Sequence, residues 1–141
     1  MHRRLLPVLL SGLGFLALLA SPAQAAPLAA NQVIKLPTGR IAKILSVSRI
    51  EYSKGVMALM VRYQTTLSVD ERKALSQEVD EVWKIAQKEV ERDGFGDAII
   101  SSNEVPKGIF ITANRMENFI YEKGADGKWT RLNRADFMAE K

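Results

Sequence analysis

Ser68–Gly94 reads SVDERKALSQEVDEVWKIAQKEVERDG, and this stretch decides the fold. Its apolar residues recur three or four positions apart, which is the spacing of one helix face; they are Leu75, Val79, Val82, Trp83, Ala86 and Val90. We predict a helix from Val69 to about Asp93 that stops at Gly94. A helix with one long apolar stripe has to lie against another surface. The segments on either side of it must therefore supply that surface.

The start of this helix carries a capping motif. Ser68–Glu71 has the form S-x-x-E. In such a motif the Ser68 hydroxyl accepts from the Glu71 N–H, and the Glu71 carboxylate reaches back to the Ser68 N–H. Further along, three acids lie off the apolar stripe and are expected to face water, with Asp80 pairing with Lys84 four positions on; they are Glu78, Asp80 and Glu81.

Strand-like segments lie on both sides of the predicted helix. They are Val33–Leu36, Ile41–Tyr52 and Val56–Thr66 before it, and Ala98–Ser102, Ile109–Ala113, Asn118–Lys123 and Lys128–Leu132 after it. Short turns at Ser53–Gly55 and Gly124–Gly127 favour antiparallel pairing. We predict an α+β fold in which a single long amphipathic helix packs on a curved, mainly antiparallel sheet. The predicted order is β-β-α-β-β-β-β, with Val33–Leu36 as a candidate edge strand.

The first 25 residues have the layout of a secretory signal peptide. Arg3 and Arg4 precede the apolar run Leu5–Ala20, and Ala23-Gln24-Ala25 offers a cleavage site between Ala25 and Ala26. The run is shorter than the roughly 20 residues that a membrane-spanning helix needs. We therefore expect a periplasmic or secreted protein without stable membrane insertion after cleavage.

Four segments follow from this interpretation. Residues 1–25 are the cleaved signal peptide, 26–40 a flexible leader with a candidate edge strand, 41–133 a single α+β domain and 134–141 a C-terminal tail. The chain from Ala26 onward holds 18 basic and 16 acidic residues, interspersed along the sequence. That balance lacks the basic stripe typical of nucleic-acid-binding proteins, so nucleic acid is not an expected partner.

The scarcity of histidine and cysteine limits the chemistry. The single histidine is His2, inside the predicted signal peptide, and the chain has no cysteine. Zinc, copper and non-haem iron sites are usually built from these two residue types. Nucleophilic triads and dyads that use histidine or cysteine are excluded, which leaves carboxylates, Lys, Tyr and Ser for catalysis. We therefore expect no metal site, no cofactor and no enzymatic activity.

Two polar loops supply the candidate site residues. They are Ser101–Gly108 and Asn114–Asn118, and within them Asn103, Glu104 and Arg115 are candidate binding residues. In a meander the two loops lie at opposite ends of the Ile109–Ala113 strand, which argues against one compact site. The alternative interpretation is that these residues form turns, with Asn103 making local backbone hydrogen bonds.

The leading functional hypothesis is an exported, non-enzymatic interaction module that binds a protein or an envelope component. Six strands are wider than one helix, so part of the sheet is expected to remain open for a partner or for a second copy in a homodimer. One alternative is a carrier of a small apolar ligand between sheet and helix, near Leu59, Val61, Trp83 and Phe119. Another is a carboxylate-dependent hydrolase of envelope glycans, which requires two acids across a groove.

Overall fold

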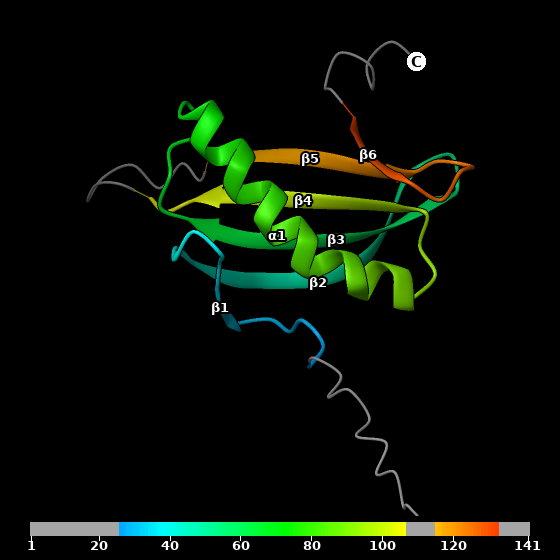
Figure 1. Cartoon of the computed structure of the whole chain (residues 1–141), viewed down its shortest axis with the longest axis horizontal. Helices are drawn as coiled ribbons and strands as arrows, with labels where there is room; N and C mark the ends of the chain where they lie inside the picture. The colour runs from blue at the N-terminus through cyan, green and yellow to red at the C-terminus, as the bar shows by residue number, and fades with distance from the viewer. Residues whose placement is uncertain (1–25, 107–114, 133–141) are drawn as a thin grey trace, which may run out of the picture.

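One α-helix lies across one face of a six-stranded sheet (Figure 1). The computed structural model describes residues 26–106 and 115–132. Within them the elements are β1 (Val33–Lys35), β2 (Ile41–Ser53), β3 (Val56–Thr65), α1 (Arg72–Arg92), β4 (Asp97–Glu104), β5 (Met116–Lys123) and β6 (Trp129–Leu132). The predicted α+β fold is confirmed. The predicted order with two strands before the helix is wrong, because the candidate edge strand forms as β1 and the described order is β-β-β-α-β-β-β. The predicted strand Ile109–Ala113, the signal peptide and the tail 134–141 lie outside the described residues.

The strands follow one another across the sheet in chain order. Every neighbouring pair is antiparallel except β3 and β4, which are parallel. Antiparallel strands can be joined by a tight turn, whereas parallel strands need a crossover. The helix α1 is that crossover, because it connects the end of β3 to the start of β4. Its place in the sequence therefore explains the single parallel pair.

The long hairpin of β2 and β3 turns tightly and bends along its length. Lys54 and Gly55 both have positive φ, 36° and 85°, as a two-residue hairpin turn of the primed type requires. The register of β2 shifts between Ile44 and Ser46 and again between Glu51 and Ser53. Such bulges bend a strand and increase its twist. Figure 1 shows β2 and β3 curving toward the hairpin tip.

The helix begins later than predicted, at Arg72. Only one half of the expected capping box forms: the Ser68 N–H donates to Glu71 Oε2 at 2.8 Å. The Glu71 N–H donates to the backbone oxygen of Ser68 at 3.0 Å and leaves the Ser68 hydroxyl to accept from the Asp70 N–H. Ser68–Glu71 is therefore a turn that precedes the helix. At the other end Gly94, with φ 77°, completes a Schellman motif in which the Phe95 N–H donates to the Val90 oxygen.

The core lies between α1 and the sheet. All six residues of the predicted stripe are buried there, together with residues of five strands. The Trp83 ring stacks on Tyr121 with 4.2 Å between ring centroids, and Trp129 meets it edge-on at 4.9 Å. The rings of Trp83, Tyr121 and Trp129 therefore pack together between the helix and the sheet.

Candidate binding surface

The face of the sheet opposite α1, called the second face below, is built from the alternate residues of each strand. Ile34 in β1 and Ala42 in β2 are paired in register and belong to the helix-side core. Side chains alternate along a strand, so their neighbours in sequence point to the second face. Within the described residues α1 is the one helix, and it lies on the first face. No described helix therefore covers the second face.

Four of these alternate residues form what we call the basic–aliphatic patch: Val33, Lys35, Ile41 and Lys43. Val33 lies opposite Lys43, and Lys35 lies opposite Ile41. The side chains of such pairs are about 5 Å apart at Cβ. Val33 is 62% exposed and Ile41 is 65% exposed, the two highest values among the large hydrophobic residues described. Both lysines are exposed, and within residues 26–106 and 115–132 neither enters an ion pair.

The apolar side chains in the middle of the second face largely cover one another. Met60, Ile99, Ile120 and Leu132 form one apolar row in register, but Ile99 is buried and the others are half-buried. The Tyr52 hydroxyl donates to Asp97 Oδ1 at 2.9 Å. This contact joins β2 to β4 across β3, where Ala58 pairs with Asp97 and is fully buried. The exposed large apolar side chains of this face therefore lie at its margins. Val33 and Ile41 form the patch, and Met116, 59% exposed, and Val56, 39% exposed, lie elsewhere on the same face.

A third cation lies beside the patch. Arg62 is exposed on β3, two residues before Gln64, the partner of Lys43 in register. Its Nη2 donates to Asn103 Oδ1 at 3.0 Å. Asn103 is itself buried, and its Nδ2 donates to the backbone oxygens of Ser101 at 3.0 Å and Tyr63 at 3.3 Å. The predicted binding residue Asn103 thus uses its amide inside the sheet, where it holds the Arg62 guanidinium in place.

The other two predicted site residues are brought together at the end of the sheet. The Glu104 N–H donates to the Arg115 oxygen at 2.9 Å, and Asn103 pairs with Met116. The expected separation of the two loops is wrong, because β4 and β5 pair directly as antiparallel neighbours. Arg115 binds both carboxylate oxygens of Asp70 at 2.8 Å. A binding role for Asn103, Glu104 and Arg115 stays a prediction.

This contact changes the ionisation of Asp70. The hydrogen bonds from Arg115, together with its positive charge, hold the pKa of the Asp70 carboxyl below its usual value. Arg115 also lies 3.9 Å from Glu104 Oε2, which accepts from the Val69 N–H. These charges therefore connect the turn before α1 to the end of β4.

One buried carboxylate, Glu78, was not predicted from the sequence. Glu78 was expected to face water, but its side chain is only 3% exposed, and that expectation is wrong. Its spacing could have predicted this burial, because residue 78 lies three positions after Leu75 and four before Val82 on the buried face. Arg40 Nη1 lies 3.6 Å from Glu78 Oε2.

Within the described part of the chain, Glu78 Oε1 and the Tyr63 hydroxyl have no hydrogen-bond partner. Burial, followed by the charge of Glu78, raises the pKa of Tyr63.

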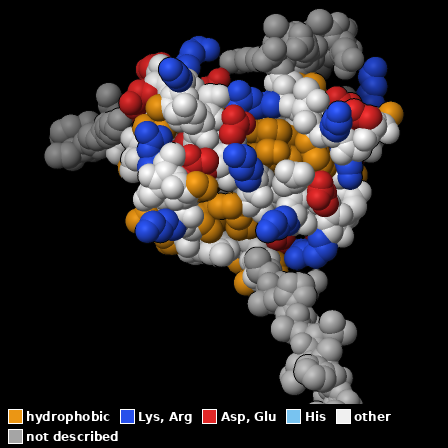
Figure 2. Space-filling view, in the orientation of Figure 1, with side chains coloured by type: hydrophobic (Ala, Val, Ile, Leu, Met, Phe, Trp, Pro, Cys, Tyr) orange, Lys and Arg blue, Asp and Glu red, His pale blue; other side chains and the backbone are white. Residues whose placement is uncertain are grey.

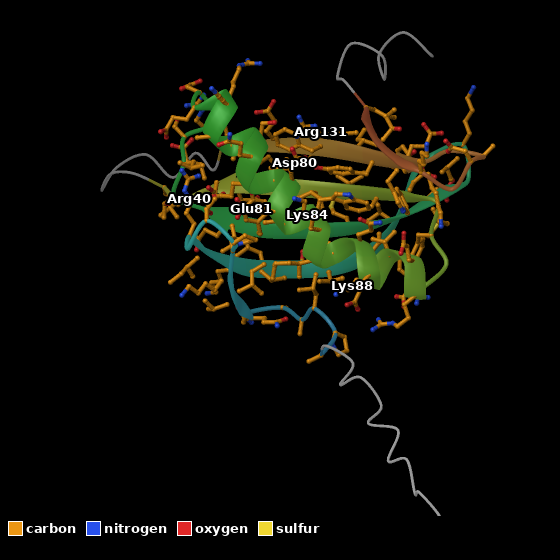
Figure 3. All side chains as sticks on the ribbon, viewed as in Figure 1. Arg40, Asp80, Glu81, Lys84, Lys88 and Arg131 are labelled. Carbon is orange, nitrogen blue, oxygen red and sulfur yellow. The ribbon has the colours of Figure 1, made fainter. Side chains whose placement is uncertain are left out.

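Both flanks of α1 are tied to the sheet by its acids (Figure 3). On one flank Glu81 Oε2 accepts from the N–H and the hydroxyl of Thr38, at 3.2 and 3.0 Å. On the other, Asp80 Oδ1 accepts from the Tyr121 hydroxyl at 2.8 Å and from Arg131 Nη1 at 3.0 Å. Asp80 therefore binds the sheet, where a pair with Lys84 was expected. Figure 2 shows positive and negative side chains interspersed over this helix face.

Three further observations concern chemistry and relatives. In the described ranges there is no cluster of three or more acidic, histidine or cysteine side chains placed to hold a metal ion. Among the same residues, no helix has the length and apolarity needed to cross a membrane. Comparison with known proteins gives no match: no protein family, no curated protein and no solved structure is significantly similar to this chain.

Proposed function

We propose that this protein is an exported, non-enzymatic binding module. Its basic–aliphatic patch binds an envelope component that presents negative charge beside apolar groups. The observation that carries the proposal is the pairing of the two most exposed large hydrophobic side chains described with two exposed lysines on one small area of sheet. Isolated exposed aliphatics are ordinary, but here they share a face with cations and no described acid lies among them.

The patch supports weak, reversible binding. Each lysine or arginine close to an anionic surface contributes about 1 kcal/mol. Lys35, Lys43 and Arg62 together then contribute about 3 kcal/mol. Complete burial of Val33 and Ile41 adds roughly 1.5–3 kcal/mol for each side chain, and partial burial adds less. A binding free energy of this size is suited to a module that associates with the envelope reversibly.

The hairpin that carries the patch is anchored to the helix by polar contacts. Its turn is fixed by Thr38, which donates twice to Glu81, and by Arg40, which lies against Glu78. Leu36 in the same turn is buried in the core. A surface that is already ordered loses little conformational entropy when it binds, which favours association through few contacts.

Capture from an envelope extract tests the proposal. The protein purified in its processed form is immobilised beside a patch variant with Val33→Ser, Lys35→Gln, Ile41→Ser and Lys43→Gln. A matched control carries Lys84→Gln and Lys88→Gln, exposed lysines of α1 (Figure 3). We expect saturable capture of one component by the protein and by the control, and its loss in the patch variant. Equal capture by all three proteins, or none by any, contradicts the proposal.

A further inference from the structure

We propose that the envelope component is a bilayer surface that contains anionic lipid, and that β1 and β2 lie on it with Val33 and Ile41 inserted. This inference rests on the proposed function and names the partner. The lysines of the patch stand diagonally to each other, as do the aliphatics, because Val33 faces Lys43 and Lys35 faces Ile41. Cations and apolar groups are therefore mixed at the scale of one lipid headgroup.

The chemistry of the patch favours lipid over a protein or a polymer. Protein interfaces are anchored by aromatic side chains and arginine in well-packed pockets. The patch has no aromatic ring, and both tryptophans of the chain, Trp83 and Trp129, pack together on the helix side. What the patch does offer, aliphatic side chains beside lysine, suits an interface between water and acyl chains.

The position of the patch also suits a flat surface. β1 is an edge strand of three residues, so within the described residues no further strand stands outside it. Lysine stems can lie along apolar surface while the ammonium groups reach outward, here to lipid phosphates. The lysines of α1 differ, because Lys84 and Lys88 share the outer helix face with Glu81 and Glu91. Those lysines therefore supply a control of equal charge.

Vesicle sedimentation tests the inference. The processed protein is mixed with phosphatidylcholine vesicles or with vesicles in which about a third of the lipid is phosphatidylglycerol. We expect binding to the anionic vesicles alone, weakened by salt. Lys35→Gln with Lys43→Gln should lower the partition coefficient about 30-fold, from the loss of two lysine contributions. Lys84→Gln with Lys88→Gln should leave it within about twofold, and Val33→Ser with Ile41→Ser should lower it at unchanged charge.

The outcomes separate this inference from the proposed function. If anionic vesicles bind no protein while an envelope component is still captured through the patch, the lipid assignment is wrong and the binding module stands. If the α1 lysine pair matters as much as the patch pair, binding follows total charge and the inference is again overturned. If neither vesicles nor extract bind, both proposals fail. Circular dichroism of each variant confirms that the fold is retained.

Discussion

The carboxylate of Glu78 lies 3.6 Å from the guanidinium of Arg40, although the Glu78 side chain is only 3% exposed. Glu78 belongs to the middle of α1, and Arg40 belongs to the turn between β1 and β2. Taking a carboxylate out of water costs free energy that a nearby cation partly offsets. The contact therefore couples the hairpin that carries the patch to the helix.

Replacing Arg40 by Met should destabilise the protein by about 1–3 kcal/mol, because a buried carboxylate then loses its cation. Adding Glu78→Leu should restore most of that stability, since a well-packed apolar side chain removes the buried charge altogether. Urea unfolding of the two single variants and the double variant gives the coupling energy. Additive effects of the two changes would show that Arg40 and Glu78 do not interact in solution.

We expect Tyr63 to make the stability of the fold sensitive to alkali. Burial, then the charge of Glu78, raises its pKa above the ordinary value of 10.0. A raised pKa means that the folded state favours the neutral phenol, so its stabilising effect is complete below pH 10.0 and is lost as the pH rises further. Tyr63→Phe should flatten the fall in melting temperature above about pH 10. Because the hydroxyl has no described partner, the same variant should lose less than about 1 kcal/mol near neutral pH.

Tyr121→Phe is the matched comparison. Its hydroxyl donates to Asp80, and burial raises its pKa as well. This variant should lose about 1 kcal/mol at neutral pH, because a formed hydrogen bond disappears. If Tyr63→Phe is the more damaging of the two at neutral pH, the Tyr63 hydroxyl has a partner in solution and our interpretation is wrong.

We expect Asp70 to contribute to the loss of stability in acid. Hydrogen bonds from Arg115 lower its pKa below the ordinary 3.8. A lowered pKa stabilises the folded state above pH 3.8, and this stabilisation disappears as the pH falls through the folded-state value. Asp70→Asn should therefore reduce the drop in melting temperature between about pH 6 and about pH 2.5. An unchanged drop would show that the ion pair does not persist in solution.

Trp83 joins the helix to the sheet through two aromatic contacts. Its ring stacks on Tyr121 and meets the edge of Trp129. Trp83→Ala should cost about 3–5 kcal/mol and should reduce the aromatic near-ultraviolet dichroism. Trp129→Ala, at the half-buried sheet edge, should cost clearly less. Equal losses would contradict this account of the core.

The helix and its partner strands could be predicted because their patterns are long. The stripe from Leu75 to Val90 repeats over several turns, and all of it is buried. The burial of Glu78 was not predicted because charged residues were expected to face water. Its position in the helix, however, belongs to the buried face. The contact between Glu104 and Arg115 was not predicted, because a strand predicted between them was expected to hold them apart. In the structure β4 and β5 are direct neighbours.

The patch could not be predicted for a different reason. Along Val33–Lys35 and Ile41–Lys43, apolar residues occupy consecutive positions, so alternation does not show which residue faces the core. The structure shows that Ile34 and Ala42 are buried in the helix-side core. Val33 and Ile41 are therefore exposed on the second face. Only the packing of α1 on the sheet could show where the exposed aliphatics meet the lysines.

A single fluorescent label tests the central claim most directly. Because the chain has no cysteine, Ile41→Cys and Lys84→Cys each create a unique thiol for an environment-sensitive dye. On mixing with membranes from the producing cell, the dye at position 41 should shift to the blue, and the dye at position 84 should not. No shift at position 41, or an equal shift at both positions, would contradict binding through the patch.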